Sequence, residues 1–181
     1  MKLYKIFEKL LQEQPISQKQ DNVNYGIPNK LIVPNTISTK GLDSIKSSEG
    51  FKEKPYVDSK KKIVIGYGTT LPNPSYRNKT ITEKEGEQLL LNHLSRYVFP
   101  VIKKYVKIAL TQNEFDALCS LIYNIGINAF IKSDLLSLGI NKRDTEKIKQ
   151  HWDWLKAYGK KTPVEGLVTR REKEKKMFFG K

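Results

Sequence analysis

Hydrophobic residues recur at helical spacing along much of the chain. Leu42 and Ile45 share one helical face and Gly50 follows them, which predicts a short helix that ends at this glycine. A longer helix is expected to begin at Thr82, because its apolar positions form a single stripe: Leu89, Leu90, Leu94, Val98 and Ile102. Pro100 lies inside this stripe and should kink or end the helix.

Other helix boundaries carry local signals. Two Thr–Glu pairs match a capping box, in which each side chain accepts a hydrogen bond from the other residue's backbone: Thr82 with Glu85, and Thr111 with Glu114. The second pair opens a predicted helix that ends at Gly126 and has its own apolar stripe: Phe115, Leu118, Ile122 and Ile125. A third helix should start at Thr162, with Pro163 in its first turn and Glu165 at its third position.

One region favours β-structure. Residues 56–70 carry Val, Ile and Tyr between turn-like lysines, which predicts a hairpin or a small antiparallel sheet. Strands do not alternate with helices along the chain, as a parallel sheet requires. We therefore expect an α+β protein that is mostly helical, with a small sheet, a long connecting helix and a helical C-terminal lobe.

The first 40 residues differ from the rest. Residues 1–14 place apolar side chains on one face of a predicted amphipathic helix, and residues 15–40 carry the prolines and amides of an extended arm or linker. No cleaved signal peptide is recognised. The helix either contacts a membrane or a partner, or it packs on the domain, which is the simpler interpretation. The predicted division is an arm at 1–40 and a compact domain at 41–181.

The strongest overall feature of the composition is the net charge. The formal net charge of +14 indicates an anionic partner such as nucleic acid, anionic lipid or the bacterial wall. The positive residues are mostly scattered lysines without arginine clusters, so base readout is not expected. No apolar run approaches the roughly 20 residues that a membrane span needs. The single cysteine, Cys119, excludes an internal disulfide and is most simply a core residue, so the redox compartment stays open.

Two carboxylates flank the start of the β region. Glu49 closes the first helix and Asp58 follows nine residues later, far enough for the pair to face each other across a cleft. Glycoside hydrolysis needs one protonated acid for the leaving oxygen and one ionised carboxylate for water or the anomeric carbon. Apolar neighbours favour Glu49 as the acid, and adjacent lysines favour Asp58 as the anion. Two acids at this spacing are also common on solvated surfaces, so spacing alone does not decide.

The residues around this pair resemble the phage-type lysozymes, the muramidase endolysins of glycoside hydrolase family 24. Glu49 and Gly50 are followed by PYVD and then IGYGTT, which is similar to that family's active-site segment. LTQNEFDALCSLIYNIGINAF, SDLLSL and HWDWLKAYGKKTPVEGLVTRREKE then match later motifs in order. The resemblance covers about residues 41–181.

The resemblance implies a two-lobed fold whose cleft cleaves the β-1,4 bond between N-acetylmuramic acid and N-acetylglucosamine. It implies that Glu49 is the general acid and Asp58 the second carboxylate. The family's third catalytic position is a threonine six residues after the aspartate, and here it is Val64. The family's histidine after GYG is replaced by Thr69. Its hairpin glycine falls at Lys61, which should need a less comfortable turn.

Val64 has nearly the shape of threonine, so only a hydroxyl that could hold the attacking water beside Asp58 is missing. The loss of one hydrogen bond, worth about 0.5–1.5 kcal/mol, predicts a rate lower on the order of tenfold. Asp58 alone, Thr69 or Thr70 could compensate, and the stereochemical outcome stays open. Alternatively, activity has been abandoned and the cleft only binds glycan. We favour activity because both carboxylates are retained in matching context.

Candidates for substrate contact are Tyr67, Thr69, Asn124, Arg170 and Arg171. Tyr67, like Tyr56, could pack on a sugar ring or form the core of the small sheet. Asn124 could bind sugar or cap local backbone. The two arginines could approach wall phosphates, brace the cleft, or form ordinary surface pairs with the glutamates of the same helix.

Metal or cofactor chemistry is not expected, because neither His93 nor His151 has partners at ligand spacing. The leading hypothesis is a monomeric peptidoglycan muramidase for host lysis, which accumulates in the host cytoplasm before release to the wall. Attachment to a virion, and contact of the N-terminal helix with an anionic membrane, stay open. The alternatives are a non-catalytic wall-binding module of the same fold and, less favoured, a nucleic-acid binder supported by charge alone.

Overall fold

The computed structural model describes residues 34–58, 61–71, 74–155 and 164–180. Its helical segments are α2 (Thr39–Glu49), the 3₁₀ segment η1 (Pro74–Asn78), α3 (Glu83–His93), the π-helical segment η2 (Leu94–Val98), α4 (Phe99–Tyr105), α5 (Gln112–Ile125), α6 (Ile127–Ile131), the π-helical segment η3 (Leu135–Gly139), the 3₁₀ segment η4 (Ile140–Lys142), α7 (Thr145–Trp154) and α8 (Glu165–Phe178). Its strands are β1 (Lys52–Val57), β2 (Ile63–Gly66) and β3 (Thr69–Thr70). The predicted helix at 1–14 lies outside the described residues.

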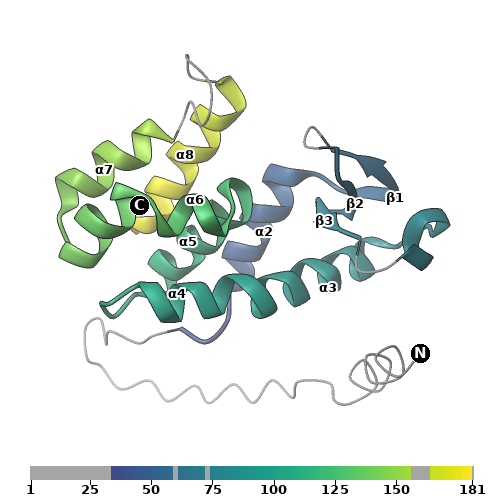
Figure 1. Ribbon diagram of the computed structural model, residues 1–181, viewed down its shortest axis with the longest axis horizontal. Helices are drawn as coiled ribbons and strands as arrows, with labels where there is room; N and C mark the ends of the chain where they lie inside the picture. The colour runs from purple at the N-terminus through teal and green to yellow at the C-terminus, as the bar shows by residue number, and fades with distance from the viewer. Residues whose placement is uncertain (1–33, 59–60, 72–73, 156–163, 181) are drawn as a thin grey trace.

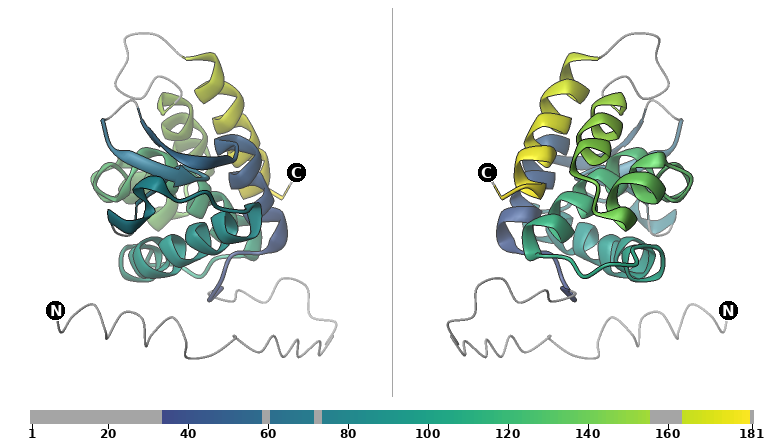
Figure 2. Two further views of the ribbon diagram at one scale, coloured as in Figure 1. Left: turned by 90° about the vertical axis from the view of Figure 1, so that its right-hand side faces the viewer. Right: turned by 90° about the vertical axis from the view of Figure 1, so that its left-hand side faces the viewer.

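The molecule has the two lobes that the sequence predicts. Figure 1 shows the sheet at one end, helices α5 to α8 at the other, and the segment from α3 to α4 extending from one lobe to the other. Helix α2 lies between the lobes, and both views in Figure 2 place it beside α8. The α+β, mostly helical class is confirmed, and α2 is positioned to carry a side chain into the space between the lobes.

The sheet is a three-stranded antiparallel meander in the order β1-β2-β3. It begins at Lys52, four residues before the predicted start at residue 56. The register pairs Tyr56 with Val64 and Val64 with Thr70, so these three residues form one row across the sheet. A second pair, Ile65 with Thr69, forms the next row.

The long helix from α3 to α4 is interrupted rather than ended. Its predicted stripe is buried for four positions at 1% exposure or less, Leu90, Leu94, Val98 and Ile102, whereas Leu89 is half-buried. The π-helical turn η2 lies directly before Pro100, which occupies the first turn of α4. Because proline lacks an N–H and its ring crowds the preceding turn, a wider turn at this point lets the helix continue past it.

Helix α5 forms the centre of the core. Its capping box between Thr111 and Glu114 is present, and Gly126 caps its C-terminus with φ of +89°. All four residues of its predicted stripe are buried, and so is Cys119 at 0% exposure. Because α5 packs against α2 and α8, it is buried on most sides and carries polar groups into the interior.

Two expected boundaries differ from the structure. Helix α8 begins at Glu165 with Val164 as its N-cap and no side-chain cap, so the prediction of Thr162 as N-cap is wrong. The division between residues 40 and 41 falls inside α2, whose N-cap is Ser38. Ile37 is also buried in the core. Within the described part of the chain, no helix combines the length and apolar character that crossing a membrane would require.

Candidate active site

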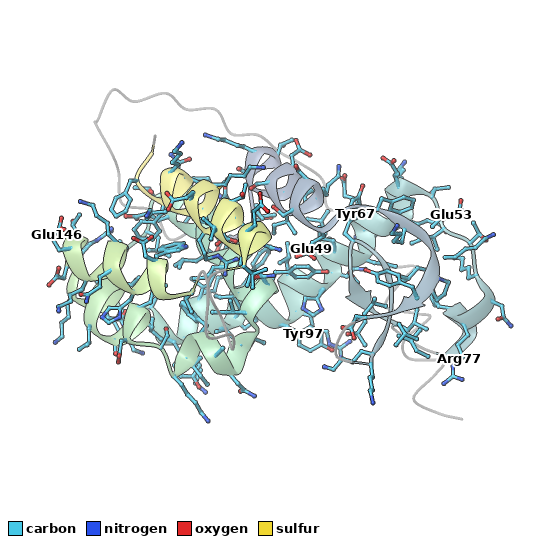
Figure 3. All side chains as sticks on the ribbon, turned by 90° about the horizontal axis from the view of Figure 1, so that it is seen from above. Glu49, Glu53, Tyr67, Arg77, Tyr97 and Glu146 are labelled. Carbon is cyan, nitrogen blue, oxygen red and sulfur yellow. The ribbon has the colours of Figure 1, made fainter. Side chains whose placement is uncertain are left out.

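Glu49 is the last residue of α2 and points into the space between the lobes. The helix stops here because Gly50 adopts a φ of +69°, a conformation that most other residues disfavour. Figure 3 shows Glu49 between the helical lobe and the sheet. The Glu49 side chain is 22% exposed, and its Oε1 lies 2.6 Å from Nη1 of Arg170 on α8. The prediction of apolar surroundings for this carboxyl is therefore wrong, because a guanidinium contacts it directly.

Behind Glu49 lies a buried group of charged residues, here called the arginine–glutamate cluster: Ser120, Arg170, Arg171 and Glu174. Arg170 Nε donates to Glu174 Oε1 at 3.0 Å, and Arg171 Nε lies 2.8 Å from Glu174 Oε2. The Ser120 hydroxyl donates to the same glutamate at 2.7 Å. The side chains of Arg170, Arg171 and Glu174 are only 7%, 0% and 1% exposed, and burial lowers the pKa of Arg171.

Both arginines are therefore buried, and they contact different residues on the side of Glu49. Arg170 braces Glu49, which is one of the roles that its sequence context suggested. Arg171 is fully buried and donates to Asn124 Oδ1 at 2.9 Å. The alternative of surface pairs is wrong for Glu174, because that pairing is buried.

Asp58 follows β1 and is held by its own hairpin turn. Its Oδ1 accepts a hydrogen bond from the backbone N–H of Lys62 at 2.8 Å. Its own N–H donates to the Lys62 carbonyl at the same distance. Lys61 has a φ of +60°, as expected for a lysine at a position that suits glycine. The side chain of Asp58 is half-buried and stays accessible to solvent.

Tyr56 lies on β1, two residues before Asp58. It is 36% exposed and lies opposite Val64 in the sheet. Its pKa is raised first by desolvation and then by the negative charges of Glu49 and Asp58. Asp58 lies two residues after Tyr56 and its N–H continues the same ladder, so the two side chains project from one face of the sheet. The pairing of Glu49 with Asp58 in catalysis stays a prediction.

Tyr123 on α5 was not recognised from the sequence, although it lies beside Glu49. Its hydroxyl donates to the Tyr67 carbonyl at 2.8 Å and lies 3.2 Å from the Thr69 hydroxyl. Because a tyrosine hydroxyl has one proton, Thr69 must be the donor in the second contact. Burial raises the pKa of Tyr123 well above its ordinary value. The signal in the sequence was its position directly before Asn124, in a motif from which we had inferred a role for Asn124 alone.

The turn after β2 approaches Glu49 closely. Gly68 has a φ of +80°, and a Cβ at this position would lie 3.5 Å from Glu49 Oε2. Tyr67, in the same turn, is 4% exposed and its ring lies 5.4 Å from that of Phe51. Thr69 is 6% exposed. The structure therefore supports the interpretation of Tyr67 as a core residue. Neither Tyr67 nor Thr69 exposes a large surface to a ligand.

A cavity of about 570 Å³ opens on the helical side of Glu49. It is lined by Ser48, Glu49, Asn124, Glu165, Gly166, Leu167, Thr169, Arg170 and Lys173. Two predicted substrate-contact residues, Asn124 and Arg170, thus lie at the cavity surface. In the described ranges no group of three or more His, Cys, Asp or Glu residues could hold a metal ion.

Known proteins are similar to this chain in both sequence and fold. Residues 46–174 match the family model described as phage lysozyme. An endolysin of Acyrthosiphon pisum secondary endosymbiont phage 1 is 37% identical over 145 residues, which cover 78% of this chain and 97% of that relative. A P22 lysozyme mutant has a TM-score of 0.69 at 33% identity, with 80% of this chain and 98% of that chain covered. For the muramidase domain of SpmX from Asticaccaulis excentricus, the TM-score is 0.70 at 34% identity, with 79% and 97% covered. The chain belongs to the phage lysozyme family.

Proposed function

We propose that this protein is a peptidoglycan hydrolase, an N-acetylmuramidase that opens the bacterial wall during phage lysis. The observation that carries the proposal is the position of Glu49 at the end of α2, between the helical lobe and the sheet and at the surface of the cavity, where Arg170 holds its carboxylate. The names of similar proteins, an endolysin and a muramidase domain, support it. The positive net charge of +14 suits an anionic wall and should make activity fall with increasing salt.

In this proposal Glu49 is the general acid and Asp58 the second carboxylate. Glu49 transfers a proton to the glycosidic oxygen as the bond to the anomeric carbon breaks. Asp58 stabilises the positive charge that develops on the sugar and directs the attacking water. Arg170 keeps the Glu49 side chain in place, since its guanidinium is itself anchored by Glu174.

Val64 is expected to lower the rate rather than abolish it. The side chain is 3% exposed and offers no hydrogen bond, so the water near Asp58 lacks a partner that a threonine would supply. One such hydrogen bond corresponds to a factor of up to about ten in rate. This feature also supports a second candidate function, a cell-wall glycan-binding module in which turnover has been lost.

The clearing of purified peptidoglycan by four proteins tests both candidates. Glu49→Gln should lose on the order of 10²–10⁴ in rate. Glu53→Gln is the control, because Figure 3 shows Glu53 on the far side of the sheet from Glu49. Val64→Thr should raise the rate by up to about tenfold. If the wild type binds peptidoglycan but does not clear it, and Val64→Thr clears it, the glycan-binding function replaces the enzymatic one.

The cellular role also has a testable part. We propose that the protein accumulates in the host cytoplasm and reaches the wall through a partner pore, with attachment to a virion as the alternative. Contact of residues 1–14 with an anionic membrane would be independent of the cleft. Deletion of these residues should then abolish binding to anionic vesicles and leave the clearing of purified peptidoglycan unchanged. Equal vesicle binding by the shortened chain would exclude this contact.

A further inference from the structure

The sheet register places a hydroxyl directly beside Val64. Thr70 on β3 is its partner across the strand pair. One position further along, the Leu71 N–H donates to the Ile63 carbonyl at 3.1 Å, so residues 63 and 71 form a hydrogen-bonded pair. Because such pairs alternate along an antiparallel ladder, Val64 and Thr70 form the closer, non-hydrogen-bonded type, with Cα atoms about 4.5 Å apart. Their side chains project from the same face of the sheet.

This face of the sheet also carries Asp58. Tyr56 lies on it, opposite Val64 on the other neighbouring strand. The ladder continues from Tyr56 to Asp58, whose N–H donates to the Lys62 carbonyl, so the Asp58 side chain projects from the same face. Thr70 is exposed, whereas Val64 is buried. The row therefore consists of the exposed Tyr56 phenol, the buried Val64 side chain and the exposed Thr70 hydroxyl.

Thr69 is excluded from the same role by its register. It pairs with Ile65, so it projects from the opposite face of the sheet. Its hydroxyl is also engaged with the Tyr123 hydroxyl at 3.2 Å, and the residue is 6% exposed. Of the two threonines that follow the turn, only Thr70 has both the face and the solvent access that a contact with water requires.

We propose that the Thr70 hydroxyl positions the attacking water in place of the hydroxyl that Val64 lacks. The inference rests on the proposed muramidase function. In the reaction the water oxygen bonds to the anomeric carbon while the bond from that carbon to the glycosidic oxygen breaks. The water proton passes to the Asp58 carboxylate, and the leaving oxygen receives the proton of Glu49. Thr70 makes a hydrogen bond to the water and has no net change of protonation.

The test is a double-substitution cycle with soluble, uncrosslinked peptidoglycan as substrate. Thr70→Val should lower kcat on the order of tenfold, with KM within about twofold, because a contact with water acts on the chemical step. Thr70→Ser keeps a hydroxyl and should retain the larger part of kcat. Val64→Thr should raise kcat much more in the Thr70→Val background than in the wild type, because the two hydroxyls would serve the same water.

Controls separate this role from a structural one. Thr145→Val removes an exposed hydroxyl from the start of α7, next to Glu146, which Figure 3 shows at the far end of the helical lobe. It should leave kcat and KM unchanged. Thermal unfolding midpoints of the Thr70 and Thr145 variants should agree with that of the wild type, because both residues are exposed.

Three results would overturn the inference. An active wild type whose kcat is unaffected by Thr70→Val refutes it while leaving the proposed function intact. A rise in KM without rescue by Val64→Thr would assign Thr70 to sugar binding instead. A wild type that does not hydrolyse peptidoglycan would contradict both the inference and the proposed function, because Thr70 would then fail to compensate for Val64.

Discussion

The two proposed catalytic carboxylates are held on their walls of the cleft in different ways. Glu49 is braced by Arg170, which is 121 positions away in the sequence and belongs to the arginine–glutamate cluster. Asp58 is held by the N–H of Lys62, only four positions away, in an exposed hairpin turn. The same kind of side chain is thus positioned by a buried tertiary network on one wall and by local backbone on the other.

This difference should separate stability from activity. A buried charge that loses its partner cannot be hydrated, so the wall behind Glu49 should contribute strongly to folding stability. The hairpin around Asp58 is reached by solvent, and water replaces a lost contact there at low cost. Substitutions behind Glu49 should therefore unfold the protein before they change its chemistry, whereas substitutions at Asp58 should do the reverse.

The largest stability effect is expected for Glu174→Gln. This change keeps the shape of the side chain but leaves the buried guanidinium of Arg171 without its counter-charge, and Arg170 with Glu49 alone, which should lower the free energy of unfolding by about 3–5 kcal/mol. Urea unfolding followed by circular dichroism measures the loss. Glu172→Gln on the same helix is the matched control, because its side chain is 40% exposed, and it should change stability by less than about 0.5 kcal/mol. A loss below 1 kcal/mol for Glu174→Gln would show that the cluster is not a major source of stability.

Asp58→Asn should have a smaller effect on stability and a large one on activity. The amide oxygen can still accept the hydrogen bond from the Lys62 N–H, so the free energy of unfolding should change by less than about 1 kcal/mol. Loss of the carboxylate should lower the rate of peptidoglycan hydrolysis on the order of 10²-fold or more. Parallel measurement of kcat and of the urea midpoint checks the pair of expectations. Equal and large losses in both would mean that the two walls do not differ as described.

Tyr123→Phe tests a contact that joins the helical lobe to the sheet. It removes the hydrogen bonds to the Tyr67 carbonyl and to Thr69, and should cost about 0.5–1.5 kcal/mol. Thermal unfolding gives the change. Tyr97→Phe, at a side chain that is 46% exposed, should leave the midpoint unchanged. If both variants unfold at the wild-type temperature, the Tyr123 hydroxyl does not help to hold the lobes together.

The smallest effect is expected for Lys61→Gly in the hairpin. Lys61 has a φ of +60°, and glycine adopts this conformation without steric cost, so stability should rise by about 0.5–1 kcal/mol. Lys62→Gly is the control, because Lys62 has no positive φ and the change should be neutral or destabilising. Differential scanning calorimetry can resolve the opposite signs. A decrease for Lys61→Gly would show that the turn is not strained.

Local signals in the sequence were enough for most of the elements. The capping boxes that start α3 and α5, and the glycines that end α2 and α5, involve residues three or four positions apart, so their hydrogen bonds form wherever the segment lies. The apolar stripes likewise reported which helical face would be buried. For α8 the expected cap at Thr162 was wrong, because the helix begins at Glu165 with Val164 as its N-cap.

The candidate site divides in the same way. The motifs around Glu49 and Asp58 could be read directly, because both residues lie in one continuous segment. The burial of Arg171 and Glu174, the place of Tyr67 in the core and the role of Tyr123 could not, since each depends on a contact with another element.

What the sequence determined by itself was the α+β class and the positions of most helices, and it supplied the two carboxylates as candidates. Only the tertiary structure decided that Arg170 supports Glu49 and that Thr70, rather than Thr69, stands beside Val64. The physical reason is that helix caps and stripes depend on neighbours along the chain, whereas ion pairs and strand register depend on how distant segments pack.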